Sequence, residues 1–115
     1  MGTLTFYHNT KCSKSRTALA MLEERGLKPR IVEYLKTPLS AQELASLIAK
    51  LGMPAQQLVR KGEEIYKSRY AGRSLTDAEW IQAMAEHPIL IERPILVKGA
   101  KAVIGRPPEN VTKLL

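Results

Sequence analysis

The first third of the chain most constrains the fold, because two strand-like runs there enclose one helix-like run. Residues 3–7 are β-branched and aromatic, residues 15–24 are rich in helix formers, and residues 31–35 return to strand composition. Gly26 is expected to end the helix. Two strands joined by a crossover of this kind pair in parallel through a right-handed connection. The sequence therefore predicts a β-α-β unit over these residues.

The middle of the chain is expected to be helical. Two capping-box patterns, in which a Ser or Thr is followed three residues later by Glu, predict that longer helices begin at Ser40 and Thr76. Leucines at helical spacing after Ser40, and Trp80 in the second helix, are expected in the core. Shorter helices are expected over residues 54–60 and 63–70.

Strand patterns return near the end of the chain. Residues 95–98 and 101–104 flank Gly99 and Ala100, and a two-residue loop that begins with glycine favours a type II′ hairpin. A closing helix through Val111 would cover the sheet. The expected order is therefore β-α-β, a helical insertion, and β-β-α.

Length and composition limit the remaining possibilities. The 115 residues suit one domain over residues 1–115, an α/β fold with a mixed sheet and a helical insertion at about residues 38–87. One cysteine excludes an internal disulfide and suits the reducing cytoplasm. We expect no membrane association, because no apolar run approaches the ~20 residues of a membrane span and no signal peptide is recognisable. The net charge of +7 comes from scattered cations, so we expect an anionic small molecule as partner and no nucleic acid.

Cys12 lies in the turn between the first strand and the first helix. A thiol at a helix start faces unpaired N–H groups and the positive end of the helix dipole, and both favour the thiolate. Lys11, Lys14 and Arg16 add positive charge, and His8 is close enough in sequence to make a hydrogen bond. The alternative is a buried structural cysteine, since free cysteine is often part of a core. A turn flanked by lysines argues against that alternative, so the sequence predicts a reactive thiol.

The spacing around Cys12 excludes two well-known cysteine sites. A phosphatase-type loop would need an arginine six positions later, where this chain has Ala18. A dithiol oxidoreductase would need a second cysteine three positions later, where this chain has Ser15. If the chain reduces a substrate, the second thiol must therefore come from another molecule.

Three segments carry a family pattern. They are Tyr7-His8-Asn9 with Cys12-Ser13-Lys14-Ser15-Arg16, then His87-Pro88-Ile89-Leu90-Ile91-Glu92-Arg93-Pro94-Ile95, and then Gly105-Arg106-Pro107-Pro108-Glu109. In this order they resemble the glutaredoxin-coupled arsenate reductase (ArsC) family over nearly the whole chain. The resemblance implies a thioredoxin-like fold, in which a cis-proline precedes the third strand, at the position of Pro94.

The resemblance also implies roles for five residues. In that family a cysteine matching Cys12 attacks arsenate and a histidine matching His8 helps to activate it. Three arginines matching Arg60, Arg93 and Arg106 hold the oxyanion. Arginine suits this role because its planar fork donates two parallel hydrogen bonds and keeps its charge. Without the resemblance, a solvated surface charge is the favoured interpretation of Arg60, whereas Arg93 and Arg106, each beside a proline, suit either interpretation.

The implied reaction reduces arsenate to arsenite through a covalent thiol–arsenate adduct on Cys12. Glutathione then attacks the adduct as co-substrate, glutaredoxin removes the glutathione, and arsenite leaves. We expect no bound metal or cofactor, because the sequence has neither a metal-ligand cluster nor a Gly-rich phosphate loop. We also expect a monomer. Two alternatives stay open: a glutathione-dependent thiol reductase with another substrate, and a regulator that binds a transcription complex. Related regulators commonly use a Cys-x-x-Cys switch, which Ser15 removes here.

Overall fold

The computed structural model describes residues 4–115, which form two compact units. The sheet unit comprises the described residues up to Thr37 together with Arg93–Leu115, and the helical unit comprises Pro38–Glu92. The helical unit contains the helical insertion expected at about residues 38–87, and the single domain stays a prediction. The expectation that Thr3 begins the first strand lies outside the described residues. Among the described residues, no helix is both long and apolar enough to cross a membrane.

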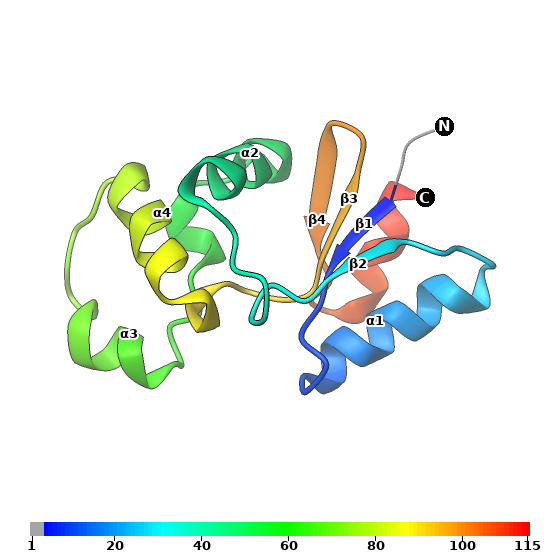
Figure 1. The fold of residues 1–115 in the computed structure, drawn as a ribbon, viewed down its shortest axis with the longest axis horizontal. Helices are drawn as coiled ribbons and strands as arrows, with labels where there is room; N and C mark the ends of the chain where they lie inside the picture. The colour runs from blue at the N-terminus through cyan, green and yellow to red at the C-terminus, as the bar shows by residue number, and fades with distance from the viewer. Residues whose placement is uncertain (1–3) are drawn as a thin grey trace. The chain divides into compact units, whose positions relative to one another are not determined.

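The sheet unit is built on a mixed four-stranded sheet (Figure 1). Its strands are β1 (Leu4–Tyr7), β2 (Arg30–Val32), β3 (Ile95–Lys98) and β4 (Lys101–Ile104). The spatial order is β2-β1-β3-β4, with β1 and β2 parallel and the other two pairs antiparallel. The parallel pair at the start of the chain and the closing hairpin are both confirmed. The mixed sheet follows, because β1 is shared between them.

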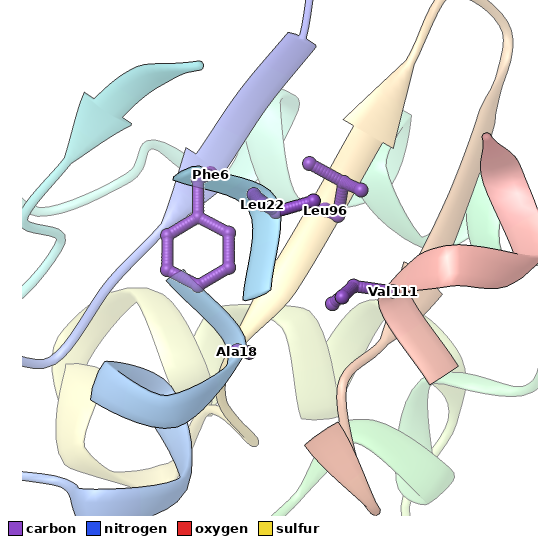
Figure 2. Close-up of a cluster of buried hydrophobic side chains, with 5 residues drawn as sticks. All are labelled: Phe6, Ala18, Leu22, Leu96 and Val111. Atoms are coloured by element: carbon purple, nitrogen blue, oxygen red, sulfur yellow. The ribbon is translucent and has the colours of Figure 1, made fainter. Parts of the chain in front are cut away.

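One face of this sheet is covered by α1 (Ser13–Glu24) and by η3, a 3₁₀ helix over Pro108–Leu114 that contacts α1. The core between them contains side chains from both helices and from the two central strands (Figure 2). These side chains are Phe6, Ala18, Leu22, Leu96 and Val111, all fully buried. Burial of each larger side chain typically contributes about 1.5–3 kcal/mol, so this core fixes α1 on the sheet and with it the turn that precedes α1.

The closing hairpin agrees with the predicted turn type. Gly99 has a φ of +60°, and among the described residues no residue other than glycine has a positive φ. A type I′ turn would need a positive φ at both central positions, so a negative φ at Ala100 fits the type II′ turn.

Two predictions for the sheet unit need correction. The second strand ends at Val32 and not at residue 35, because the backbone N–H groups of Lys36 and Thr37 both donate to the carbonyl of Glu33 and close a turn there. The closing helix is 3₁₀ and not α-helical. The hydroxyl of Thr112 donates to the carbonyl of Glu109 at 2.7 Å, a local side-chain bond of the kind that competes with helical hydrogen bonding.

The helical unit contains five helical segments. They are α2 (Ala41–Leu51), η1 (Ala55–Leu58), α3 (Glu64–Arg69), α4 (Asp77–Glu86) and η2 (Pro88–Leu90). Both predicted capping boxes are confirmed, at Ser40 and at Thr76. Most of the leucine stripe and the tryptophan are buried as predicted, whereas Leu51 at the end of α2 is only partly buried. The buried side chains of α2 and α4 are Leu44, Leu47, Ile48, Trp80, Ala83 and Met84.

The predicted helix over residues 54–60 is too long. The 3₁₀ helix η1 ends at Leu58, and Val59 then forms an antiparallel bridge with Ile91. The N–H of Arg60 donates to the carbonyl of Leu90 at 2.7 Å, which continues this bridge. Arg60 therefore lies outside the helix, because pairing with the segment after η2 takes precedence over the helical pattern.

Candidate active site

Cys12 is the N-cap residue of α1, as the sequence predicts. Its backbone is extended, with φ −91° and ψ 120°, which is the usual conformation of a residue just before a helix. Its N–H donates to the carbonyl of Asn9 at 3.0 Å and its carbonyl accepts from the N–H of Arg16 at 3.0 Å. The thiol is partly buried. These contacts fix the sulfur at the N-terminus of α1 without enclosing it.

The environment of Cys12 favours the thiolate. Partial burial by itself raises the pKa of the thiol, but the backbone N–H of Ser15, the guanidinium of Arg93 and the backbone N–H of Lys14 outweigh it. The net result is a pKa below that of an ordinary cysteine. The side chain of Cys12 makes no capping hydrogen bond of standard geometry. The charged group that lowers this pKa is Arg93, whereas the sequence predicts the neighbouring cations of the turn.

Arg106 also lies beside the thiol. Its Nη2 is 3.6 Å from Cys12 Sγ, and its Nε donates to the carbonyl of Arg93 at 2.7 Å. The side chain of Asn110 in turn donates to the carbonyl of Arg106 at 2.9 Å. Two of the three arginines implied by the family resemblance therefore meet at Cys12 within one unit. The Arg106 guanidinium bridges Cys12 Sγ and the backbone carbonyl of Arg93.

Both arginines precede a cis-proline. The cis bond between Arg93 and Pro94 is confirmed, and a second one links Arg106 to Pro107. Sequence reasoning missed the second, since cis bonds occur at only ~5% of X–Pro positions and no local pattern distinguishes this one. The N–H of Gly105 donates to the carbonyl of Pro94 at 2.8 Å, so the two arginine–proline segments are hydrogen-bonded to each other.

His8 is buried beside the turn, with only 6% of its surface exposed. Its Nδ1 lies 2.6 Å from the hydroxyl of Ser15, whereas the sequence had suggested a direct contact with Cys12. Burial lowers the pKa of His8; nearby Glu33 opposes this and Arg16 adds to it. Burial thus favours the neutral imidazole of His8, and its hydrogen-bond partner Ser15 belongs to the first turn of α1.

Arg60 lies in the helical unit with two carboxylates around it. Its Nε is 3.2 Å from Glu63 and its Nη1 is 2.8 Å from Glu92, and 20% of its side chain is exposed. These ion pairs offset much of its charge. Arg60 is therefore not the simple surface cation that the sequence alone allowed. Its role toward an oxyanion rests on the family resemblance.

Sequence reasoning missed two polar residues that shape the site. Asn9 and Ser15 stand in the segment that carries the family resemblance, but the sequence assigns neither of them a role at the thiol. Both are buried, and the N–H of Asn9 donates to the Ser15 hydroxyl at 3.2 Å. Burial marks these two polar residues as part of the site, but the local sequence pattern does not reveal that they are buried. Within residues 4–115, no three His, Cys, Asp or Glu side chains gather as a metal site would require.

Comparison with known proteins identifies the family. The family model described as "ArsC family" matches residues 7–114. The chain belongs to the ArsC family. This ArsC chain is 48% identical over 111 residues to the arsenate reductase of Haemophilus influenzae, covering 95% of this chain and 93% of that protein. It is 40% identical over 117 residues to the arsenate reductase of Neisseria meningitidis serogroup A, covering both chains in full.

The solved structures agree with this assignment. The arsenate reductase from Vibrio cholerae superposes on this ArsC chain with a TM-score of 0.95 at 46% identity, covering 99% of this chain and 98% of that one. The thioredoxin-like α/β fold predicted for this chain is confirmed by such neighbours.

Proposed function

We propose that this chain is an arsenate reductase that uses the Cys12 thiolate as nucleophile. The observation that carries the proposal is the meeting of Cys12 with Arg93 and Arg106. The sulfur stands at a helix N-terminus, one guanidinium lies 3.6 Å away and another lowers the pKa of the thiol. A thiolate surrounded by donors for a tetrahedral anion suits attack on an oxyanion. The arsenate reductases of Haemophilus and Neisseria support arsenate as that anion.

The proposed reaction balances only with thiols from other molecules. The Cys12 thiolate attacks As(V), a sulfur–arsenic bond forms, and one arsenic-bound oxygen leaves as water. Glutathione then attacks the adduct, and a glutaredoxin thiol removes it as a mixed disulfide. Those two thiols supply the two electrons that convert As(V) to As(III). Water then breaks the sulfur–arsenic bond, which releases arsenite and returns Cys12 as the free thiol. The sequence has one cysteine, so it cannot supply the second sulfur itself.

The three proposed oxyanion ligands are not equivalent. Arg93 and Arg106 act on Cys12 within the sheet unit, whereas Arg60 shares its charge with Glu63 and Glu92. We therefore assign Arg93 and Arg106 the main part in binding the anion. Arg60 is given a smaller part, and His8 a supporting part in activating the thiol.

A coupled assay tests the proposal. The chain is incubated with arsenate, glutathione, glutaredoxin, glutathione reductase and NADPH, and NADPH oxidation is followed. Turnover should require arsenate, glutathione and glutaredoxin together, and Cys12→Ser should abolish it. Turnover that persists without arsenate, with another disulfide or oxyanion as substrate, would favour a general glutathione-dependent reductase. An inactive chain that retains RNA polymerase in a pull-down would instead favour the regulator.

A further inference from the structure

The Ser15 hydroxyl connects three parts of the active-site turn. Ser15 is in the first turn of α1 and is fully buried. Its oxygen lies 2.6 Å from Nδ1 of His8 and accepts the N–H of Asn9 at 3.2 Å. Its own backbone N–H is among the groups that favour the Cys12 thiolate. Ser15 therefore contacts the histidine through its side chain, and its backbone N–H favours the thiolate of the nucleophile.

Asn9 transmits this connection to the nucleophile. The carbonyl of Asn9 accepts the N–H of Cys12 at 3.0 Å, and its side-chain oxygen accepts the N–H of Lys11 at 3.0 Å. Asn9, which is hydrogen-bonded to Ser15, therefore also fixes the backbone N–H groups of Lys11 and Cys12. The outer side of the turn is closed by Arg16, which donates to the carbonyl of Thr10 at 2.8 Å.

The hydrogen-bond inventory of the hydroxyl favours one direction for the short contact. A serine hydroxyl has one proton to donate and two lone pairs. The N–H of Asn9 occupies one lone pair, so Nδ1 of His8 could either accept the proton or donate to the second lone pair. Because Ser15 is fully buried and its hydroxyl has no other acceptor among the described residues, donation to Nδ1 is the direction that leaves its proton satisfied. His8 then carries its own proton on Nε2. A buried neutral histidine matches this arrangement, because an imidazolium would present a proton at Nδ1 as well.

We propose that Ser15 is a positioning residue that couples His8 to Cys12. Its hydroxyl fixes the His8 tautomer with the proton on Nε2, and holds Asn9 so that the Cys12 sulfur stays in front of the helix N-terminus. This inference rests on the proposed nucleophilic role of Cys12, but its test does not require arsenate. His8 acts on the nucleophile through Ser15, without a direct contact.

The first measurement is a mutant cycle read by alkylation of Cys12. Because the chain has a single cysteine, the rate of iodoacetamide reaction against pH reports on that thiol alone. Ser15→Ala should raise the midpoint by about 0.7 pH unit, a roughly fivefold smaller thiolate population, as expected for one neutral hydrogen bond. His8→Phe, which keeps the ring packed against Phe6 at 5.4 Å, should also raise it. In the double variant His8→Phe should add less than twofold to Ser15→Ala.

The matched control is Ser13→Ala, an exposed serine in the same helical turn, which should leave the midpoint unchanged. Ser15→Thr keeps the hydroxyl and should restore most of the wild-type midpoint if the buried site accepts its methyl group. Effects of Ser15→Ala and His8→Phe that simply multiply would overturn the coupling. An unchanged midpoint in Ser15→Ala would overturn it as well.

The second measurement uses the wild-type chain, so it does not depend on whether the Ser15 variants fold. The ¹⁵N chemical shifts of the His8 ring in the wild-type chain near neutral pH distinguish the two tautomers. The proposal requires an unprotonated Nδ1 and a protonated Nε2, and a protonated Nδ1 would overturn it. If the tautomer and the alkylation cycle behave as stated while arsenate is not reduced, the function proposed above fails and the positioning role of Ser15 stands.

Discussion

Replacing Arg106 with lysine is expected to lower kcat/KM for arsenate roughly tenfold to 150-fold. The arginine makes two contacts at once, from Nε to the Arg93 carbonyl at 2.7 Å and from Nη2 to Cys12 Sγ at 3.6 Å. A lysine has one nitrogen and cannot keep both. The Coulomb attraction between the Arg106 charge and the Cys12 thiolate at 3.6 Å is about 1.2 kcal/mol in water and about 4.6 kcal/mol at an effective dielectric constant of 20. Loss of one charge-assisted hydrogen bond, about 1.5–3 kcal/mol, lies within these limits and gives the stated range.

The assay is the coupled reaction with arsenate as the varied substrate. The control is Arg30→Lys, an exposed arginine on β2, which should change kcat/KM less than twofold. Stability of each variant is checked by denaturant unfolding, so that a loss of folded protein is not mistaken for a loss of binding. Equal and negligible effects at Arg106 and Arg30 would remove Arg106 from the oxyanion site and leave the fold untouched.

Three further predictions follow from the same contacts. Iodoacetamide alkylation of Cys12 should rise with pH and level off at a midpoint below about 8.5, because the folded chain favours the thiolate; a midpoint at or above that value would remove the activation argument. Gly105→Ala would place its Cβ 2.8 Å from a carbon of the Pro94 ring, so unfolding free energy should fall by about 1–3 kcal/mol, whereas Gly62→Ala, with open space around it, should change it by less than about 0.5 kcal/mol. Arg60→Lys should lower kcat/KM less than Arg106→Lys, because two carboxylates already share the Arg60 charge; the reverse order would contradict that reasoning.

Local features of the fold could be predicted because each has its cause within a few residues. Both capping boxes, the Gly99 hairpin and the placement of Cys12 at a helix start depend on side chains that contact their own neighbourhood. The errors lie where a distant contact decides. The helix expected over residues 54–60 ends early because Val59 pairs with Ile91, which no local pattern contains.

The active site shows the same division. The position of Cys12 follows from the strand-turn-helix pattern, but the arginine beside its sulfur is 94 residues away in sequence. Only the family resemblance indicated Arg93 and Arg106 beforehand. The bond between His8 and Ser15 spans seven residues, yet it could not be predicted, because it depends on burial of both side chains between β1 and α1.

The most direct test of the central claim is to identify the arsenic product. The chain is incubated with arsenate, glutathione and glutaredoxin, and arsenate and arsenite are separated by chromatography and quantified over time. The wild-type chain should form arsenite in step with disulfide, and Cys12→Ser, a nearly isosteric change in a turn, should form none while remaining folded. Arsenite formed at the same rate by Cys12→Ser, or none formed by the wild-type chain, would contradict the account.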